Sequence, residues 1–216
     1  MIAPLFGFID YQQCQYFTTK LSSNELIVFK KSFIIENPIF SLEPRTIMDV
    51  DKYILGELGE EFVCVSEEEN QQIAVAMVRQ AEFNLDILSQ DFDPDVYDNN
   101  DFCEAIEELA LRSRYSRIRI LLHDAKKASQ RGHLVIHLGR RLGSLMQIRS
   151  TAKYHKGIPD TFMLVDDIGV MHRPHSDTLA AYVNFKDRPK VKKLAELFEK
   201  LWSEAEPDPN TCHIVL

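Results

Sequence analysis

Helix-like and strand-like stretches alternate along this chain from residue 66 onward, and this alternation restricts the folds it can adopt. Apolar residues recur at helical spacing in residues 66–81, from 101 onward, in 125–142 and in 189–205. Short strand-like runs occupy residues 83–88, 116–122, 145–149, 161–165, 169–171 and 180–185. The order predicts an α/β fold, with a mostly parallel sheet flanked by helices. A hairpin predicted at Asp166-Asp167 makes the sheet mixed.

The first 65 residues have a different pattern, with few helix signals. Strand-like runs lie at residues 26–29, 33–35 and 61–65. We therefore expect residues 1–65 to be a β-rich N-terminal extension and residues 66–216 to be the α/β domain. The extension should pack on the main domain, because about 60 residues with so few helix signals rarely fold alone. An edge strand is expected at residues 212–216.

Composition excludes several classes of protein. Of the 216 residues 45% are hydrophobic and 27% are charged, which is ordinary for a soluble chain. Four scattered cysteines form no CxxC pair, which argues against a zinc ribbon or a disulfide framework and favours a reducing compartment. No apolar run approaches the roughly 18 residues of a membrane span, and the first residues do not look like a secretory signal. We expect a cytoplasmic protein without a membrane partner.

Charge divides unevenly along the chain. Residues 36–108 carry 20 acidic and 3 basic residues, a net of −17, whereas residues 109–200 carry 19 basic and 8 acidic residues, a net of +11. The plainer interpretation is that charges pair between the two halves on a solvated surface. The alternative is a basic groove for a nucleic acid or another phosphate-bearing partner, whose binding would weaken with salt.

Histidines suggest two sites, each with a plainer alternative. His133 and His137 have the spacing of a metal-binding helix, but no Glu follows His133, so histidines on the helix surface or at the edge of the core are the favoured interpretation and no metal is expected. Polar residues also bracket the predicted hairpin. They supply the bases, cations and acids of a phosphodiester-cleaving site: His155, Lys156, Asp160, Asp166, Asp167, His172, Arg173, His175 and Asp177.

Arginines of the second half form a further candidate group. Guanidinium groups bind phosphate and carboxylate with two parallel hydrogen bonds. The group is Arg112, Arg114, Arg117, Arg119, Arg131, Arg140, Arg141 and Arg149. The structural interpretation is that they bind the acidic residues 90–108. Glycine is scarce, at 8 residues, and no GxGxxG or Walker loop is present, so we expect no cofactor bound by a glycine-rich loop.

Three stretches resemble the phospholipase-D-like fold. The first runs from residues 70–72 to LSQDFDPDVYD at 88–98, and resembles the opening helix and strand of that fold. RIRILLHD at 117–124, with residues 131–133 and 140–142, resembles its central strand and crossover helix. FMLVDD at 162–167, with residues 184–185 and 198–202, resembles its closing elements. More narrowly, the chain is similar to an uncharacterised bacterial domain often found behind GNAT-type acetyltransferase domains.

The resemblance implies a scaffold without its catalytic groups. Active phospholipase-D-like proteins carry His-x-Lys, followed by an Asp five residues after the Lys. No His of this chain has Lys two places on, and the matching positions fall near residues 159–162. Asp166 or Asp167 matches the Asp, while the later Asn-x-Glu stands as Asn184-Phe185-Lys186.

We therefore expect a non-catalytic binding or regulatory module. Its pocket should lie at the carboxyl ends of the strands, between the turn at residues 123–131 and residues 153–175. The resemblance and the basic second half predict a phosphate-bearing ligand or nucleic acid, bound without a metal or cofactor. Its candidate binding residues are Arg131, Lys153, His155, Lys156, Asp166, His172 and Arg173.

Two alternatives remain. The first is a phosphodiesterase or nuclease that uses His155, His172 or His175, and it requires these side chains to converge beside an Asp. The second is a protein-interaction module, either a homodimer or a partner of an acyltransferase, in which the acidic residues 90–108 of one copy meet the basic strand of another.

Overall fold

Two compact units make up the chain, residues 1–45 and residues 46–216. The structure, a computed structural model, describes residues 17–18, 28–29, 49–57, 59–155, 157–176 and 178–207. In the first unit, β1 (Phe17–Thr18) pairs antiparallel with β2 (Val28–Phe29). The strands predicted at 33–35 and 212–216 lie outside the described residues.

The described strands of the second unit form an eight-stranded sheet in the order β10-β6-β5-β4-β7-β8-β9-β3. They are β3 (Phe62–Cys64), β4 (Asn84–Ser89), β5 (Arg117–Leu122), β6 (Met146–Ser150), β7 (Thr161–Val165), β8 (Gly169–Arg173), β9 (Ala181–Asn184) and β10 (Glu206–Pro207). The helices are α1 (Glu67–Gln80), α2 (Pro94–Tyr97), α3 (Asn100–Arg112), α4 (Ala125–Gln130), α5 (Leu134–Leu142) and α6 (Arg188–Ser203). Single 3-10 turns are η1 (Val50–Lys52), η2 (Gly143–Leu145) and η3 (Lys153–His155). The predicted α/β class with flanking helices is confirmed.

Most strand pairs in this sheet are antiparallel, so the prediction of a mostly parallel sheet is wrong in that detail. β4 pairs with β5, and β5 with β6, in parallel, while the other described pairs are antiparallel. Helices connect β4 to β5 and β5 to β6, and such crossovers return the chain to the starting edge. Only η3 lies between β6 and β7 among the described residues. β7 therefore starts at the edge of the sheet where β6 ends, and it runs in the opposite direction.

β3 joins this sheet from residues that the sequence assigned to the N-terminal extension. It pairs antiparallel with β9, with Val63 opposite Tyr182. The predicted boundary between residues 65 and 66 thus falls just after a strand of the main sheet. Packing of the rest of residues 1–65 on the α/β domain stays a prediction.

The helix predicted over residues 125–142 is two helices, α4 and α5. Gly132, between them, has a φ of +75°, a left-handed conformation that glycine adopts without steric cost and that commonly ends a helix. His133 follows in a non-helical conformation and caps α5, because its Nδ1 accepts a hydrogen bond from the Val135 N–H at 3.3 Å. This elbow turns the chain beside the end of β5.

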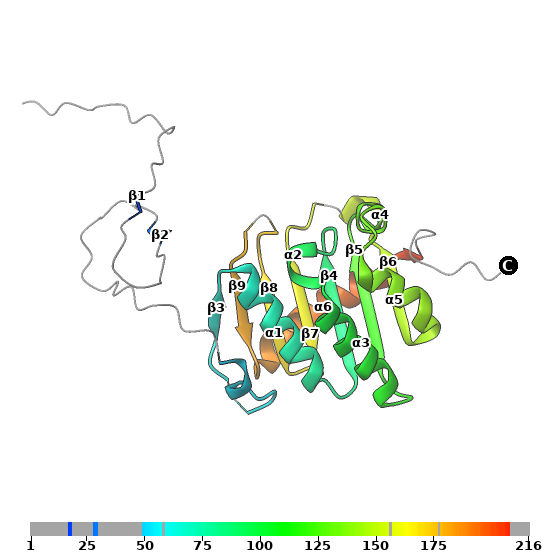
Figure 1. Cartoon of the computed structure of the whole chain (residues 1–216). Coiled ribbons are helices and arrows are strands. Elements are labelled where there is room, and N and C mark those ends of the chain that lie inside the picture. The colour runs from blue at the N-terminus through cyan, green and yellow to red at the C-terminus, as the bar shows by residue number, and fades with distance from the viewer. Residues whose placement is uncertain are drawn as a thin grey trace, which may run out of the picture. The chain divides into compact units, whose positions relative to one another are not determined.

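The sheet separates two apolar cores. α1, α3 and α5 lie on one face and α6 on the other (Figure 1). On β5, Ile118 and Ile120 join the core beneath α1, α3 and α5, and Leu121 joins the core beneath α6. Because side chains alternate along a strand, Arg119 shares the α6 face with Leu121.

One edge of the sheet gathers the ends of several strands, and we call it the carboxyl edge. β4, β5 and β6 all end there, since they run in parallel. Thr161, the first residue of β7, pairs with Arg173, the last residue of β8, at the same edge, next to Leu88 and Phe162. Ligands of open α/β sheets bind outside the carboxyl ends of strands. The loops at this edge are therefore the expected location of a binding site.

Candidate functional site

A pocket of about 560 Å³ lies at the carboxyl edge. Its walls come from three segments, which follow β4, β5 and β8. It is lined by Gln90, Asp91, Asp93, Pro94, Asp95, Asp124, Lys127, Arg131, Arg173, Ser176, Thr178 and Leu179. We call it the edge pocket. Its place agrees with the pocket predicted from the sequence, but its walls differ in part.

Asp91 connects the segment after β4 to α4. Its Oδ2 lies 2.6 Å from Lys127 Nζ and 2.8 Å from Arg131 Nη1. Burial by itself would raise the pKa of the Asp91 carboxyl, but the hydrogen bonds and positive charges of Lys127 and Arg131 bring that pKa below its ordinary value. One carboxylate therefore serves two cations, and both cations keep some hydrogen-bonding capacity for another group.

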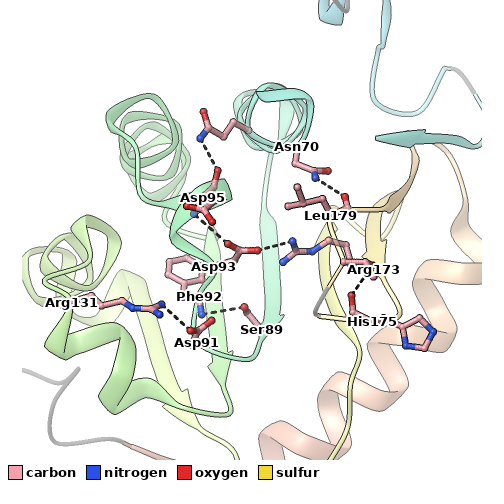
Figure 2. Close-up of polar contacts among 12 residues, drawn as sticks. Asn70, Ser89, Asp91, Phe92, Asp93, Asp95, Arg131, Arg173, His175 and Leu179 are labelled. Carbon is pink, nitrogen blue, oxygen red and sulfur yellow. Dashed lines mark hydrogen bonds and ion pairs between the residues drawn. The ribbon is translucent and has the colours of Figure 1, made fainter. Parts of the chain in front are cut away.

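Arg173 lies on the opposite wall, at the end of β8. It is 3% exposed, and its Nη1 lies 2.6 Å from Asp93 Oδ2 (Figure 2). Nε and Nη1 are both enclosed by protein, and apart from this ion pair neither has a hydrogen-bond partner among the described residues. A buried donor without an acceptor costs about 1–3 kcal/mol. The site thus holds a buried cation that is only partly compensated.

Phe92, between Asp91 and Asp93, fixes the direction of both carboxylates. It is fully buried, and its φ is +57°, a conformation that non-glycine residues rarely adopt. Its N–H donates to Ser89 Oγ at 3.2 Å. Its ring stacks on Tyr97, with centroids 4.9 Å apart, and packs at a tilt against His133, with centroids 4.6 Å apart. The packing of this ring holds a strained backbone in place, so Asp91 and Asp93 point to different walls of the pocket.

Side-chain amides of α1 donate hydrogen bonds to two segments at the rim of the edge pocket. Asn70 Nδ2 donates to the Leu179 carbonyl oxygen at 2.8 Å, and Gln71 Nε2 donates to the Asp95 carbonyl oxygen at 2.7 Å (Figure 2). These bonds join segments that are far apart in sequence. The pocket is consequently attached to the rigid part of the fold.

Of the seven predicted binding residues, the structure brings Arg131 and Arg173 together in the edge pocket. Lys153 and His155 lie on η3 and do not line it. His155 Nε2 instead lies 2.8 Å from Glu204 Oε2, near the end of α6. Lys156 lies outside the described residues. The functional role of these residues stays a prediction.

His172 and Asp166 also lie apart from the edge pocket. His172 is on the α6 side of β8, beside Phe162, and its Nε2 lies 2.8 Å from Asp160 Oδ1. Asp166 is in the turn between β7 and β8, at the opposite edge of the sheet. Its carboxylate accepts N–H bonds from residues 82–84, which fastens that turn to the start of β4.

The arginine group is partly paired with the acidic segment, as the structural interpretation predicted. Arg131 binds Asp91, and Arg141 Nη2 lies 2.6 Å from Glu107 Oε2. For Arg119 the prediction is wrong: its guanidinium binds Asp86 and Glu199, with nitrogen–oxygen distances of 2.7 Å. The reason is the strand's alternation, which turns Arg119 toward α6.

The histidine pair proposed for metal does not share a helix face. His133 precedes α5 and is 1% exposed, packed on Phe92, whereas His137 lies within α5 and lines a separate pocket. Among the described residues, no group of three or more His, Cys, Asp or Glu side chains is arranged to hold a metal ion.

Sequence reasoning missed the residues that complete the edge pocket. Asp91, Asp93, Asp124 and Lys127 were not singled out, although each follows the carboxyl end of β4 or β5. The available signal was the run Asp-Phe-Asp-Pro-Asp directly after an apolar strand. A proline and acids at this place indicate a loop at the carboxyl end of a strand.

Similar solved structures share the fold at low sequence identity. NucT from Helicobacter pylori is 13% identical, with 69% of this chain and 99% of NucT covered and a TM-score of 0.51. TrmBL2, an archaeal chromatin protein, is 16% identical, with 70% of this chain and 55% of TrmBL2 covered and a TM-score of 0.50. Nuc from Salmonella typhimurium, a phospholipase D family member, is 14% identical, with 69% and 99% covered and a TM-score of 0.47. The likeness to NucT and TrmBL2 concerns the fold alone.

Three further findings concern the sequence and its described helices. A comparison with curated proteins finds no match. None of the described helices combines the length and the apolar character that crossing a bilayer needs. A family model described as a domain of unknown function, DUF7931, matches residues 66–213, which is more than half of the chain, and this chain belongs to that family.

Proposed function

We propose that this chain is a non-catalytic module that binds a phosphate-bearing ligand in the edge pocket. The observation that carries the proposal is that three cations from separate segments, Lys127, Arg131 and Arg173, line one pocket at the carboxyl edge. Arginine's planar fork suits phosphate oxygens. Lys127 and Arg131 face the same pocket from α4 and the elbow after it.

The paired carboxylates limit how tightly phosphate would bind. Asp91 and Asp93 already neutralise part of the cationic charge. A phosphate group that enters the pocket therefore becomes a second partner of cations that are already paired with carboxylates. Such a site favours moderate, salt-sensitive affinity, as expected of a regulatory module.

The absence of catalysis is supported by what lines the pocket. None of its described lining residues is a histidine, and the positions that match the His-x-Lys motif fall near residues 159–162, which hold neither His nor Lys. In the described part of the chain, His155 and His172 bind separate carboxylates, Glu204 and Asp160. They do not converge as the enzyme alternative requires.

The neighbours in fold are consistent with a phosphate-bearing partner. TrmBL2 is described as showing a novel mode of DNA binding, and Nuc as a phospholipase D family member. Nucleic acid is therefore one source of the phosphate group. The proposal does not depend on that source, because the cations of the pocket recognise the phosphate itself.

Calorimetric titration of the full chain with inorganic phosphate, a mononucleotide and an oligonucleotide, at low and high salt, tests the proposal. We expect binding that weakens with salt. The double variant Lys127→Ala/Arg131→Ala should bind at least about tenfold more weakly, because Asp91 then faces the ligand without its cations. The matched control is Lys192→Ala/Lys193→Ala, which removes two exposed cations of α6 and should bind as the unchanged chain does. Absence of binding, or equal loss in both variants, contradicts the proposal.

A hydrolase remains the second candidate because of His172 and Asp160. A carboxylate 2.8 Å from an imidazole nitrogen can orient the ring for proton transfer. Release of nitrophenol from bis(nitrophenyl) phosphate is the assay. Hydrolysis that is lost in His172→Ala, but kept in His175→Ala, would support the enzyme, and an inert unchanged chain would remove it.

The interaction-module alternatives, a homodimer or an acyltransferase partner, remain predictions as well. Light scattering of the full chain across a salt series tests the homodimer. A dimer that dissociates as salt rises would support a charge-paired interface, whereas a monomer at every salt concentration would remove it.

A further inference from the structure

The charges on the wall of the edge pocket do not suit a polyanion. Three cations, Lys127, Arg131 and Arg173, share the wall with four carboxylates, so the formal net charge of the lining is −1. The carboxylates are Asp91, Asp93, Asp95 and Asp124. A nucleic acid strand brings one negative charge about every 3.4 Å. Its first phosphate would contact the cations, but its next phosphates would approach the carboxylates and be repelled by them.

Two of these carboxylates have accepting capacity left over. Asp124 caps α4 through one oxygen, which accepts the Lys127 N–H at 3.0 Å, and its other oxygen accepts no hydrogen bond from a described residue. Asp95 is bound through its backbone, because its N–H donates to Asp93 Oδ1 at 3.2 Å and its carbonyl oxygen accepts from Gln71. Ionised carboxylates only accept hydrogen bonds. The part of a ligand that lies beside them must therefore donate.

The lining also offers no surface on which a base would stack. The described residues of the wall include no aromatic side chain, since Phe92 and Tyr97 are turned into the core. Recognition of single-stranded nucleic acid relies on such aromatic platforms. A volume of about 560 Å³ instead matches a small molecule.

We propose that the ligand of the edge pocket is a small phosphorylated polyol, with its phosphate on Arg173, Arg131 and Lys127 and its hydroxyl groups donating to Asp95 and Asp124. This inference rests on the proposed function and narrows its ligand class. The three cations of the lining, Arg173, Arg131 and Lys127, give the place where the phosphate would lie. The acceptors on the same wall then select what the phosphate is attached to.

Titrations of the full chain with a panel of probes test the inference: glucose 6-phosphate, glucose, inorganic phosphate, phosphoethanolamine, AMP, ribose 5-phosphate and decathymidylate. Glucose 6-phosphate should bind at least about tenfold more tightly than glucose, inorganic phosphate or decathymidylate, because only it satisfies both halves of the wall. AMP should bind no more tightly than ribose 5-phosphate, since the lining has nothing on which a base can stack.

A pair of acid variants separates the polyol from the phosphate. In Asp95→Asn/Asp124→Asn, the preference for glucose 6-phosphate over inorganic phosphate should fall several-fold, while binding of inorganic phosphate persists. Asp101→Asn, an exposed acid of α3 outside this pocket, is the control and should keep the preference.

The outcomes distinguish the two proposals. If inorganic phosphate binds, and glucose 6-phosphate binds no better, the polyol inference fails and the proposed function stands. The same holds if phosphoethanolamine, AMP or decathymidylate binds most tightly. If no phosphate-bearing probe binds, or glucose alone binds as well as its phosphate, both proposals fail.

Discussion

At the scale of single residues, His133 connects the edge pocket to the core. Its ring packs on Phe92, and its Nδ1 lies 3.5 Å from Asp98 Oδ1 while accepting the Val135 N–H. Burial lowers the pKa of His133 below the ordinary value of 6.5, and the positive charge of Arg131 acts in the same direction. Asp98, Asp91 and a hydrogen bond with the Phe92 backbone oppose this shift. The neutral ring is therefore the form that holds Phe92 in place.

This gives a pH dependence of stability whose sign is fixed. Because the pKa of His133 is lower in the folded chain than in the unfolded chain, the unfolded chain binds more protons below about pH 6.5. The free energy of unfolding should then fall as the pH falls from 6.5 toward the folded pKa. Urea unfolding at several pH values should show a shallower fall in His133→Gln than in the unchanged chain. His175→Gln, which changes an exposed ring, should leave the slope as it is, and equal slopes in all three chains would contradict the assignment.

Asp166 has a structural role that the sequence could not separate from a catalytic one. The family resemblance matches it to an Asp of the active-site motif, yet its carboxylate accepts three backbone N–H bonds from residues 82–84. The residue sits in a turn with a φ of +50°. A motif position identifies the residue type, but only the fold shows which edge of the sheet it occupies.

Replacing Asp166 should cost stability and leave binding alone. Asp166→Ala should lower the free energy of unfolding by about 2–4 kcal/mol, because three N–H groups lose an ionised acceptor. Asp167→Ala is the neighbouring control, because Asp167 also has a positive φ, +55°, but its exposed carboxylate takes no hydrogen bond from a described residue. It carries the same backbone cost and should lower stability clearly less than Asp166→Ala. Urea unfolding measures both. A stable Asp166→Ala chain with lost phosphate binding would refute this structural role.

At the scale of elements, the sequence predicts a helix end well where a capping residue marks that end. Ser66 and Glu69 form the capping box of α1 at the start of the helical pattern over 66–81. α3 is capped by Asn99, ahead of the helical pattern that starts at 101, and Gly132 interrupts the predicted helix over 125–142. Strand direction depends on which segments meet after folding, and the period of apolar residues in one strand contains no information about it. For this reason the prediction of a mostly parallel sheet was wrong.

The joint between the sheet and α6 depends on one buried cation. Arg119, 6% exposed, binds Asp86 within the sheet and Glu199 on α6, and its guanidinium lies 4.9 Å from the Phe198 ring centre. The hydrogen bonds and charge of Arg119 lower the pKa of Glu199 below its ordinary value, although partial burial opposes this.

Replacing Arg119 alone should lower the free energy of unfolding more than replacing both Arg119 and Asp86. Arg119→Met should destabilise the chain by about 3–5 kcal/mol, because Asp86 is left charged and buried. The double variant Arg119→Met/Asp86→Leu should recover a large part of that loss, since no uncompensated charge remains. Chemical unfolding of the two variants measures this. A double variant as unstable as the single one would mean that packing, and not charge burial, sets the cost.

At the scale of the whole molecule, the sequence predicted where a site would form better than what would form it. The carboxyl edge follows from the order of elements, and Arg131 and Arg173 follow from the basic second half. Asp91 and Asp93 stand in a recognisable acidic run after a strand, but their pairing with Lys127 and Arg173 forms only when the loops after β4, β5 and β8 come together. Pairing of charges across the pocket is a property of the fold, because no local spacing in the sequence specifies it.

The most direct test of the central claim observes Arg173 itself. In an NMR titration of the full chain with inorganic phosphate, the Arg173 Nε–H resonance, assigned with Arg173→Lys, should shift in a saturable manner. The Arg119 Nε–H, which is hydrogen bonded to Asp86 on the other side of the sheet, should stay unshifted as an internal reference. An unshifted Arg173 resonance, or a shift of Arg119 as large as that of Arg173, would contradict phosphate binding in the edge pocket.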